Sequence, residues 1–262
     1  MRRSAIGPAG RIPLRYYDAR ADRGDSPVIL FLHGGGFVIG NLDTHHPFCT
    51  SLAKALDLPV VAVDYRLAPE HPFPAAPDDC EAAARWVASN PVALPFTPTG
   101  LVPCGDSAGG NLAIVTARAL QKEPADVPVV AQFPVYPVVD SQGEYESFRE
   151  CSEGFLLTAE TMEWFGKQYA AEAGNERNDV LHEDLDGTPP TLVVTAGLDP
   201  LRDQGKAYAA KLRNAGVSVR EMTADGNIHG FICIRKMIPS SQQDIDQMFV
   251  LMNETLEEVG AK

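Results

Sequence analysis

The chain has 262 residues, of which 45% are hydrophobic and 22% charged, and this composition excludes intrinsic disorder of the chain as a whole. Lysine and arginine number 22 against 35 aspartate and glutamate residues, so the formal net charge is −13. Nucleic acids and anionic membranes bind basic surfaces, and the charge therefore argues against both as partners. The length corresponds to one large or two small domains, and we expect a single domain over residues 1–262.

The N-terminal segment MRRSAIGPAG has no apolar stretch behind its arginines, so we expect no cleavable secretory signal. No stretch reaches the roughly 18 uninterrupted apolar residues of a membrane-spanning helix. We therefore expect a cytoplasmic protein without membrane insertion. The cysteines are scattered and form no C-x-x-C pair, which favours reduced, mostly buried thiols over a disulfide or a zinc site: Cys49, Cys80, Cys104, Cys151 and Cys233.

Short apolar runs alternate with helical patterns along most of the chain. Strands are predicted over 28–33, 59–65, 100–105, 127–138, 191–197 and 218–223. Helices are predicted over 47–57, 78–89, 111–123, 203–216 and 241–259. Near-continuous apolar strands that alternate with helices indicate an α/β fold, with a mainly parallel sheet covered on both faces. Residues 11–19 add a candidate antiparallel edge strand.

The segment 140–190 breaks this alternation, because it lacks any strand pattern. Within it, Thr158 is placed to cap a helix whose apolar stripe is formed by Met162, Phe165 and Tyr169. Insertions of this length in compact α/β domains are usually lids or pocket walls. We therefore expect 140–190 to form a cap over the carboxyl ends of the strands, where open α/β sheets bind their ligands.

The sequence GDSAGG fits the Gly-x-Ser-x-Gly pattern between a predicted strand and a predicted helix, with Ser107 at its centre. A sharp strand-to-helix turn needs small neighbours, which Gly105 and Gly109 provide, and it leaves the serine hydroxyl clear of the chain. Ser107 is therefore the candidate nucleophile. The alternative is an ordinary turn in which Ser107 merely caps the following helix.

A second glycine-rich motif, His33-Gly34-Gly35-Gly36, directly follows the first strongly apolar strand. Successive glycines leave backbone N–H groups accessible, as stabilisation of an oxyanion requires. The expected donors are the N–H groups of Gly34, Gly35 and Ala108, the last being the residue after the nucleophile. A flexible loop and a phosphate-binding loop are the alternatives, although the latter lacks the Lys-Ser/Thr of a P-loop.

A serine nucleophile needs a base and a carboxylate that orients the base. Of the six histidines, only His229 follows both other candidates at the carboxyl end of a strand. Asp199 ends the strand at 191–197 and is favoured over Asp203, which is expected to cap a helix or support the loop. The order Ser107, Asp199, His229 is typical of α/β-hydrolases. Candidate acyl-pocket residues, which could equally be ordinary core, are Phe37, Phe155 and Leu156.

Five ordered motifs, HGGGF, DYRLAPEHPFPAA, GDSAGGNLA, GLDPLRD and IHGF, closely resemble those of the hormone-sensitive-lipase-like carboxylesterases of bacteria and archaea. The resemblance runs from about Gly7 to the last helix. It implies an α/β-hydrolase fold, no cofactor or metal, and hydrolysis of small carboxylic esters with short to medium acyl chains through an acyl-enzyme. It implies Ser107 as nucleophile, His229 as base and Asp199 as its orienting acid, and a homodimer formed through the last strand.

One departure from the family pattern concerns the cap. Family members carry additional helical residues ahead of the segment that resembles IGPAGRIPLRYYDA, which here begins close to Met1. We therefore expect a reduced cap built mainly from 140–190, a more open mouth and broader access for bulky esters.

Three other functions are compatible with these motifs. A ligand-binding protein on the same fold is disfavoured by the presence of His229. An amidase or peptidase would use the same three residues and differ in the leaving group that it protonates. A lipase acting on insoluble long-chain fat would need an apolar surface segment, and none is evident in the sequence.

Overall fold

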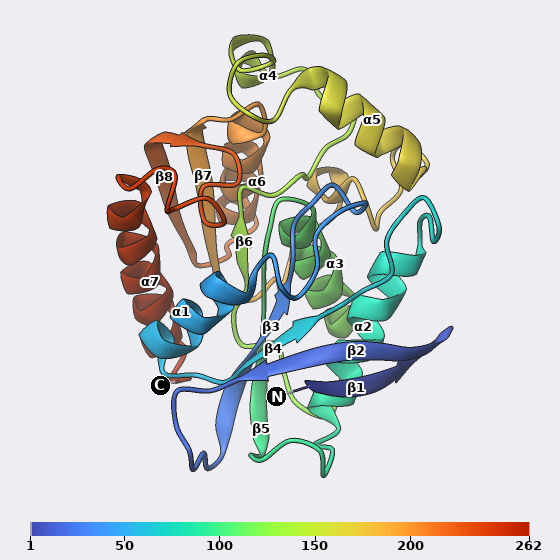
Figure 1. Ribbon diagram of the computed structural model, residues 1–262, viewed down its shortest axis with the longest axis vertical. Coiled ribbons are helices and arrows are strands. Elements are labelled where there is room, and N and C mark those ends of the chain that lie inside the picture. The colour runs from blue at the N-terminus through green and yellow to red at the C-terminus, as the bar shows by residue number, and fades with distance from the viewer. Residues whose placement is uncertain (1, 262) are drawn as a thin grey trace.

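The computed structural model describes residues 2–261, and in them eight strands form one sheet with helices on both of its faces (Figure 1). The spatial order of the strands is β1-β2-β4-β3-β5-β6-β7-β8. Their bounds are β1 Arg2–Gly7, β2 Gly10–Tyr17, β3 Ser26–Leu32, β4 Val60–Val63, β5 Pro98–Asp106, β6 Phe133–Val135, β7 Thr191–Leu198 and β8 Val219–Ile228. The strands from β4 across to β8 are parallel, which confirms the predicted α/β sheet.

The central strands are apolar throughout because both of their sides are buried. The four residues of β4 are all buried, as are six of the seven in β3. In β3, Leu32 pairs with Val63 of β4 on one side and with Gly105 of β5 on the other. Since β3 ends at Leu32 and β5 ends one residue after Gly105, the loops that follow β3 and β5 start side by side at the same edge of the sheet.

The helices cover the two faces of this sheet (Figure 1). Helices α1 and α7 pack together on one face, over a core that contains Phe31, Phe48 and Phe133. Helices α2, α3 and α6 cover the other face, where Leu30 and Leu112 belong to the core. No helix within residues 2–261 is both long enough and apolar enough to cross a bilayer. The bounds are α1 His46–Leu56, α2 Ala75–Ala88, α3 Ala108–Lys122, α6 Arg202–Asn214 and α7 Ser241–Glu258.

Two strand predictions need correction. The predicted strand at 11–19 is antiparallel as expected, but β1 lies outside it and forms the edge of the sheet. The predicted strand at 127–138 is reduced to the three residues of β6 and isolated bridges at Val129 and Gln132. Prolines 128, 134 and 137 have no backbone N–H, so most of this apolar run cannot form a continuous hydrogen-bonded ladder.

The segment 140–190 contains no strand and lies over the carboxyl ends of the strands (Figure 1). The Thr158 hydroxyl accepts a hydrogen bond from the Thr161 N–H at 3.2 Å, which confirms the predicted helix cap. Asn111 of α3 anchors the segment, because its amide donates to the carbonyl of Val138, just before the segment, and to that of Asn178 within it. The helical elements are α4 Glu146–Glu150, α5 Ala159–Tyr169 and the 3₁₀ turn η1 Val180–His182.

A glycine-to-alanine pair tests how closely α3 packs on the sheet. A Cβ atom at Gly109 would overlap the carbonyl oxygens of Leu32 and His33, so Gly109→Ala is expected to lower the free energy of unfolding by about 3 kcal/mol. Gly166 lies inside α5 with open space around it, so Gly166→Ala is expected to raise the same quantity by about 0.5–1 kcal/mol. Urea denaturation measures both, and equal effects of the two substitutions would contradict this packing.

Candidate active site

Ser107 is the only residue between β5 and α3, and the turn there is strained. Its backbone has φ 56° and ψ −121°, a left-handed conformation that costs a non-glycine residue about 1–3 kcal/mol. The Ser107 N–H donates to the Val135 carbonyl of β6 at 2.9 Å, which holds the turn against the sheet. Carbonyl groups surround Gly105 and Gly109, and neither position has room for a Cβ atom. The hydroxyl of Ser107 consequently faces the cavity above the sheet.

Two further strands position His229 and Asp199 beside Ser107. Strand β8 ends immediately before His229, and β7 ends immediately before Asp199. His229 Nε2 lies 2.8 Å from Ser107 Oγ, and His229 Nδ1 lies 2.7 Å from Asp199 Oδ2. Asp199 is fully buried, and its other oxygen accepts the Leu201 N–H at 2.8 Å. A buried carboxylate opposite Nδ1 keeps the proton there, so Nε2 is the nitrogen that can accept the serine proton.

Asp203, the other carboxylate considered in this loop, has a different position. Its Oδ2 accepts the Ser147 N–H at 2.8 Å, and its Oδ1 accepts a hydrogen bond from Arg202 Nε at 2.8 Å. Asp203 therefore ties α4 of the cap segment to the start of α6. The structure brings Ser107, His229 and Asp199 together and leaves Asp203 in a supporting role.

The glycine loop after β3 differs from the expectation at one residue. The Gly34 N–H donates to Asp106 Oδ1 at 2.8 Å, so it is already occupied and does not face the serine as a free donor. Within residues 2–261, no acceptor is found for the N–H groups of Gly35 and Gly36. The Ala108 N–H belongs to the first turn of α3, where no intrahelical acceptor exists. The available donors are thus Gly35, Gly36 and Ala108, which corrects the expectation for Gly34.

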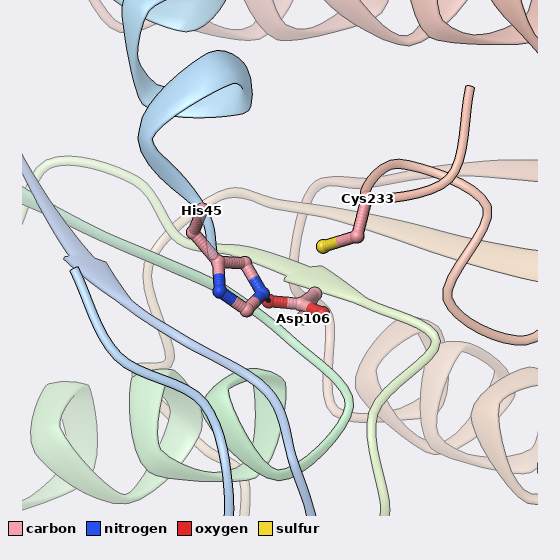
Figure 2. A group of neighbouring side chains, drawn as sticks. All are labelled: His45, Asp106 and Cys233. Carbon is pink, nitrogen blue, oxygen red and sulfur yellow. Dashed lines mark ion pairs between the residues drawn. The ribbon is translucent and has the colours of Figure 1, made fainter. Parts of the chain in front are cut away.

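Asp106 holds the glycine loop in place through its side-chain contacts. Besides Gly34, it faces the His45 imidazole, with Nε2 3.1 Å from Oδ1, and both side chains are buried. Burial disfavours charge on each of them, but their mutual attraction prevails, so the pKa of Asp106 is lowered and that of His45 is raised. Figure 2 shows the two side chains with the Cys233 thiol facing them. Asp106 is therefore a structural hydrogen-bonding group.

His33 supports the same loop as a neutral side chain. Its Nδ1 lies 2.8 Å from the Gly34 carbonyl, its ring stacks on Tyr65, and burial lowers its pKa to about 4. An unfolded histidine has a pKa near 6.5, so the folded state excludes a proton that the unfolded state takes up. The stabilisation is complete above about pH 6.5 and is lost as the pH falls towards about 4.

A pH series on His33→Gln tests this. Between pH 7.5 and pH 5 the wild type is expected to lose about 2 kcal/mol more unfolding free energy than the variant, because only the wild type excludes this proton. Urea titrations at each pH provide the comparison. Parallel stability curves for the two proteins would show that His33 does not titrate in this way.

Ser107 and His229 line a cavity of about 780 Å³ whose walls are mostly apolar. Phe37 lies in its wall with φ 63° and stacks on Tyr169 at 3.8 Å between ring centres. Leu156 also lines the cavity and is 63% exposed. Phe155 is half-buried and is not part of the lining, which corrects its assignment as a pocket residue. The cap residues that line the cavity instead include Phe148, Met162 and Phe165.

The helical stripe of α5 was the sequence signal for this wall. The spacing of Met162, Phe165 and Tyr169 predicts one apolar helix face, and all three residues line the cavity. The side chain of Phe165 occupies the space where a Cβ atom at Gly36 would lie. The glycine loop and α5 are thus in direct contact, and residues of the segment 140–190 form one wall of the cavity.

Comparison with known proteins agrees with this geometry. A sequence model of the alpha/beta hydrolase fold matches residues 29–233, well over half of the chain. The chain belongs to the α/β-hydrolase family. Within this family, the hydrolase has the motifs of the hormone-sensitive-lipase-like branch. The match confirms the resemblance to that branch which the sequence motifs indicated.

The relatives that match this chain along most of its length are named as esterases or ester hydrolases. The hydrolase is 37% identical to the carboxylic ester hydrolase LipN of Mycobacterium tuberculosis, over 98% of this chain and 70% of that protein. It is 36% identical to the ethyl acetate hydrolase of Pseudomonas putida, over 94% of this chain and 78% of that protein. A solved esterase of Pyrobaculum calidifontis superposes with a TM-score of 0.91 at 37% identity, covering 97% of this chain and 85% of that one.

Proposed function

We propose that this hydrolase cleaves short- to medium-chain carboxylic esters through a Ser107–His229–Asp199 triad and an acyl-enzyme intermediate. The chain is a serine carboxylic ester hydrolase by its family and by the activities named for its relatives. The observation that carries the mechanism is the continuous hydrogen-bonded series from buried Asp199 through His229 to Ser107, at 2.7 and 2.8 Å.

Acylation begins with proton transfer. His229 Nε2 takes the proton of Ser107 as the hydroxyl oxygen attacks the ester carbonyl carbon. Asp199 holds the imidazole in orientation and stabilises the imidazolium that forms. The imidazolium then gives its proton to the departing alcohol, and the acyl group stays on Ser107. A water molecule, activated by His229 in the same way, releases the acid and restores the serine.

The tetrahedral intermediate carries a negative oxygen that needs donors already in place. The N–H groups of Gly35, Gly36 and Ala108 are the available set beside Ser107, and removal of one such donor typically costs about 3–4 kcal/mol of transition-state stabilisation. The bond from Gly34 to Asp106 supports their orientation, because it fixes the first residue of the glycine loop to the strand that carries the nucleophile.

The cap segment supplies the apolar wall that would receive the substrate. We infer that residues 140–190 act as a lid over the site, with Phe148, Met162 and Phe165 against the acyl or alcohol group. Phe37, whose ring stacks on Tyr169 of α5, also forms part of the wall. A cavity of about 780 Å³ with exposed apolar residues at Ile39 and Leu156 suits small ester molecules.

Hydrolysis of a p-nitrophenyl ester series from acetate to palmitate tests this function. We expect kcat/KM to be highest among the short and medium acyl chains and to fall towards palmitate. Emulsified triacylglycerol and a p-nitroanilide serve as comparison substrates for lipase and amidase activity. Preference for the emulsion or the anilide would overturn the proposed substrate class, and folded protein without turnover of any ester would overturn the esterase function.

A further inference from the structure

Three side chains with metal-binding atoms meet beside the candidate active site (Figure 2). His45 lies just before α1, Asp106 ends β5, and Cys233 follows β8 in the loop after His229. One nitrogen, one oxygen and one sulfur from these residues all lie within 4.8 Å of one another. None of the three belongs to the proposed triad, and all three face the same cavity as Ser107.

The His45 imidazole is buried without a proper hydrogen bond at Nε2. Its side chain is only 7% exposed, and Nε2 forms an ion pair with Asp106 Oδ1 at 3.1 Å, a contact that lacks the geometry of a hydrogen bond. Ligand atoms on one tetrahedral zinc ion lie about 3.3 Å apart, given metal–ligand distances of about 2.0–2.1 Å. The spacing of these two atoms, without hydrogen-bond geometry, therefore suits ligands that share one ion.

The residues around these three side chains meet the other requirements of a zinc site, which are an oriented imidazole and a path for the ion. His45 Nδ1 lies 2.9 Å from the Thr44 hydroxyl, and a contact of this type at the second nitrogen orients a metal-bound imidazole. Cys233 is exposed, and the cavity that it lines leads past the glycine loop, so an ion has a path to the three ligands. A mixed set of imidazole, carboxylate and thiolate favours Zn²⁺ over Mg²⁺ or Ca²⁺, which prefer oxygen ligands alone.

We propose that His45, Asp106 and Cys233 form an inhibitory zinc site, in which the bound ion blocks ester hydrolysis. On binding, Zn²⁺ forms bonds to His45 Nε2, a carboxylate oxygen of Asp106 and Cys233 Sγ, and water fills the fourth position. The thiol proton, and any proton on Nε2, pass to the solvent. The ion changes no oxidation state and is not a cofactor of the reaction.

Inhibition follows from the second contact of Asp106. Its Oδ1 accepts the Gly34 N–H at 2.8 Å and is also the carboxylate oxygen closest to His45. A zinc ion that draws this oxygen away competes with Gly34 and shifts the loop that carries the Gly35 and Gly36 donors. Because Asp106 directly precedes Ser107, the same movement displaces the nucleophile. This part of the inference rests on the proposed esterase function, whereas zinc binding does not.

Cobalt substitution and zinc inhibition test the two parts separately. Co²⁺ bound through a thiolate gives a sulfur-to-metal charge-transfer band, which we expect in the wild type and in Ser107→Ala. The band should be absent in Cys233→Ala and present in Cys151→Ala, a matched loss of another thiol. Zn²⁺ should inhibit the wild type and Cys151→Ala, with reversal by EDTA. Cys233→Ala should need at least about tenfold more zinc, since losing even an outer-shell partner costs a metal site that much.

The possible outcomes are distinct. A band that is missing from the wild type, or that persists in Cys233→Ala, overturns the metal site. Equal zinc sensitivity of Cys233→Ala and the wild type, each normalised to its own metal-free activity, places the inhibitory ion elsewhere and overturns the inhibition. A band with the expected variant pattern in a protein without esterase turnover leaves the site standing and removes the proposed function.

Discussion

Replacing Ser107 with alanine is expected to lower kcat for p-nitrophenyl acetate by a factor of about 1,000 or more. The substitution removes the oxygen that lies 2.8 Å from His229 Nε2, and the acyl-enzyme cannot form without it. The remaining turnover would come from the oxyanion donors and His229 acting on water. Initial rates at saturating substrate measure the effect.

Ser89→Ala is the matched control for this substitution. Ser89 follows α2, and its hydroxyl donates to the Trp86 carbonyl at 2.8 Å, away from the cavity, so this variant should turn over ester at the wild-type rate. Circular dichroism and urea denaturation confirm that both variants are folded. A folded Ser107→Ala protein within tenfold of the wild-type kcat would exclude Ser107 as the nucleophile.

Asp199→Asn is expected to lower kcat by about 10⁴-fold while the fold stays intact. The asparagine amide can donate to His229 Nδ1, which leaves the ring proton on Nε2, and that nitrogen then cannot accept the proton of Ser107. Asparagine has nearly the size of aspartate, and its carbonyl oxygen can still accept the Leu201 N–H that Asp199 now binds. The effect on stability should therefore be much smaller than the effect on rate.

Asp203→Asn separates the two carboxylates of this loop. Asp203 bonds to Ser147 and Arg202 and does not touch His229, so its loss should affect unfolding free energy more than kcat. We expect kcat of this variant within about tenfold of the wild type, since surface and loop contacts of this kind contribute little to the chemical step. A larger loss of kcat in Asp203→Asn than in Asp199→Asn would reverse the assignment of the acid.

The sequence predicts the parts of the site that depend on where strands end. Ser107 and Asp199 follow directly after apolar strands, whereas His229 follows β8, a half-buried strand that extends five residues beyond the predicted 218–223. Parallel strands bring their carboxyl ends to one edge of the sheet. The apolar character of β3 and β4 results from burial on both faces, so the parallel core was also predictable. The Thr158 cap was predictable for a local reason, because a cap and its helix are adjacent in sequence.

Contacts between distant segments were not predictable in the same way. Gly34 donates to a carboxylate 72 residues away, and nothing in the glycine motif indicates which of its N–H groups is occupied. The backbone of segment 140–190 places Phe148 of α4 in the cavity wall and Phe155, in the loop after α4, outside it. Likewise His45, Asp106 and Cys233 are separated by long stretches of sequence, so their spacing does not resemble that of a metal-binding motif.

The most direct test of Ser107 as the activated nucleophile is to locate the residue that diethyl p-nitrophenyl phosphate labels covalently. The serine oxygen forms a bond to phosphorus as p-nitrophenolate departs, and the diethylphosphoryl group remains on the enzyme. Intact-mass and peptide analysis should find one adduct per chain, on Ser107, with loss of activity in proportion to labelling and no adduct in Ser107→Ala. An adduct on another residue, or ester hydrolysis that continues in fully labelled protein, would contradict the assignment of Ser107 as the activated nucleophile.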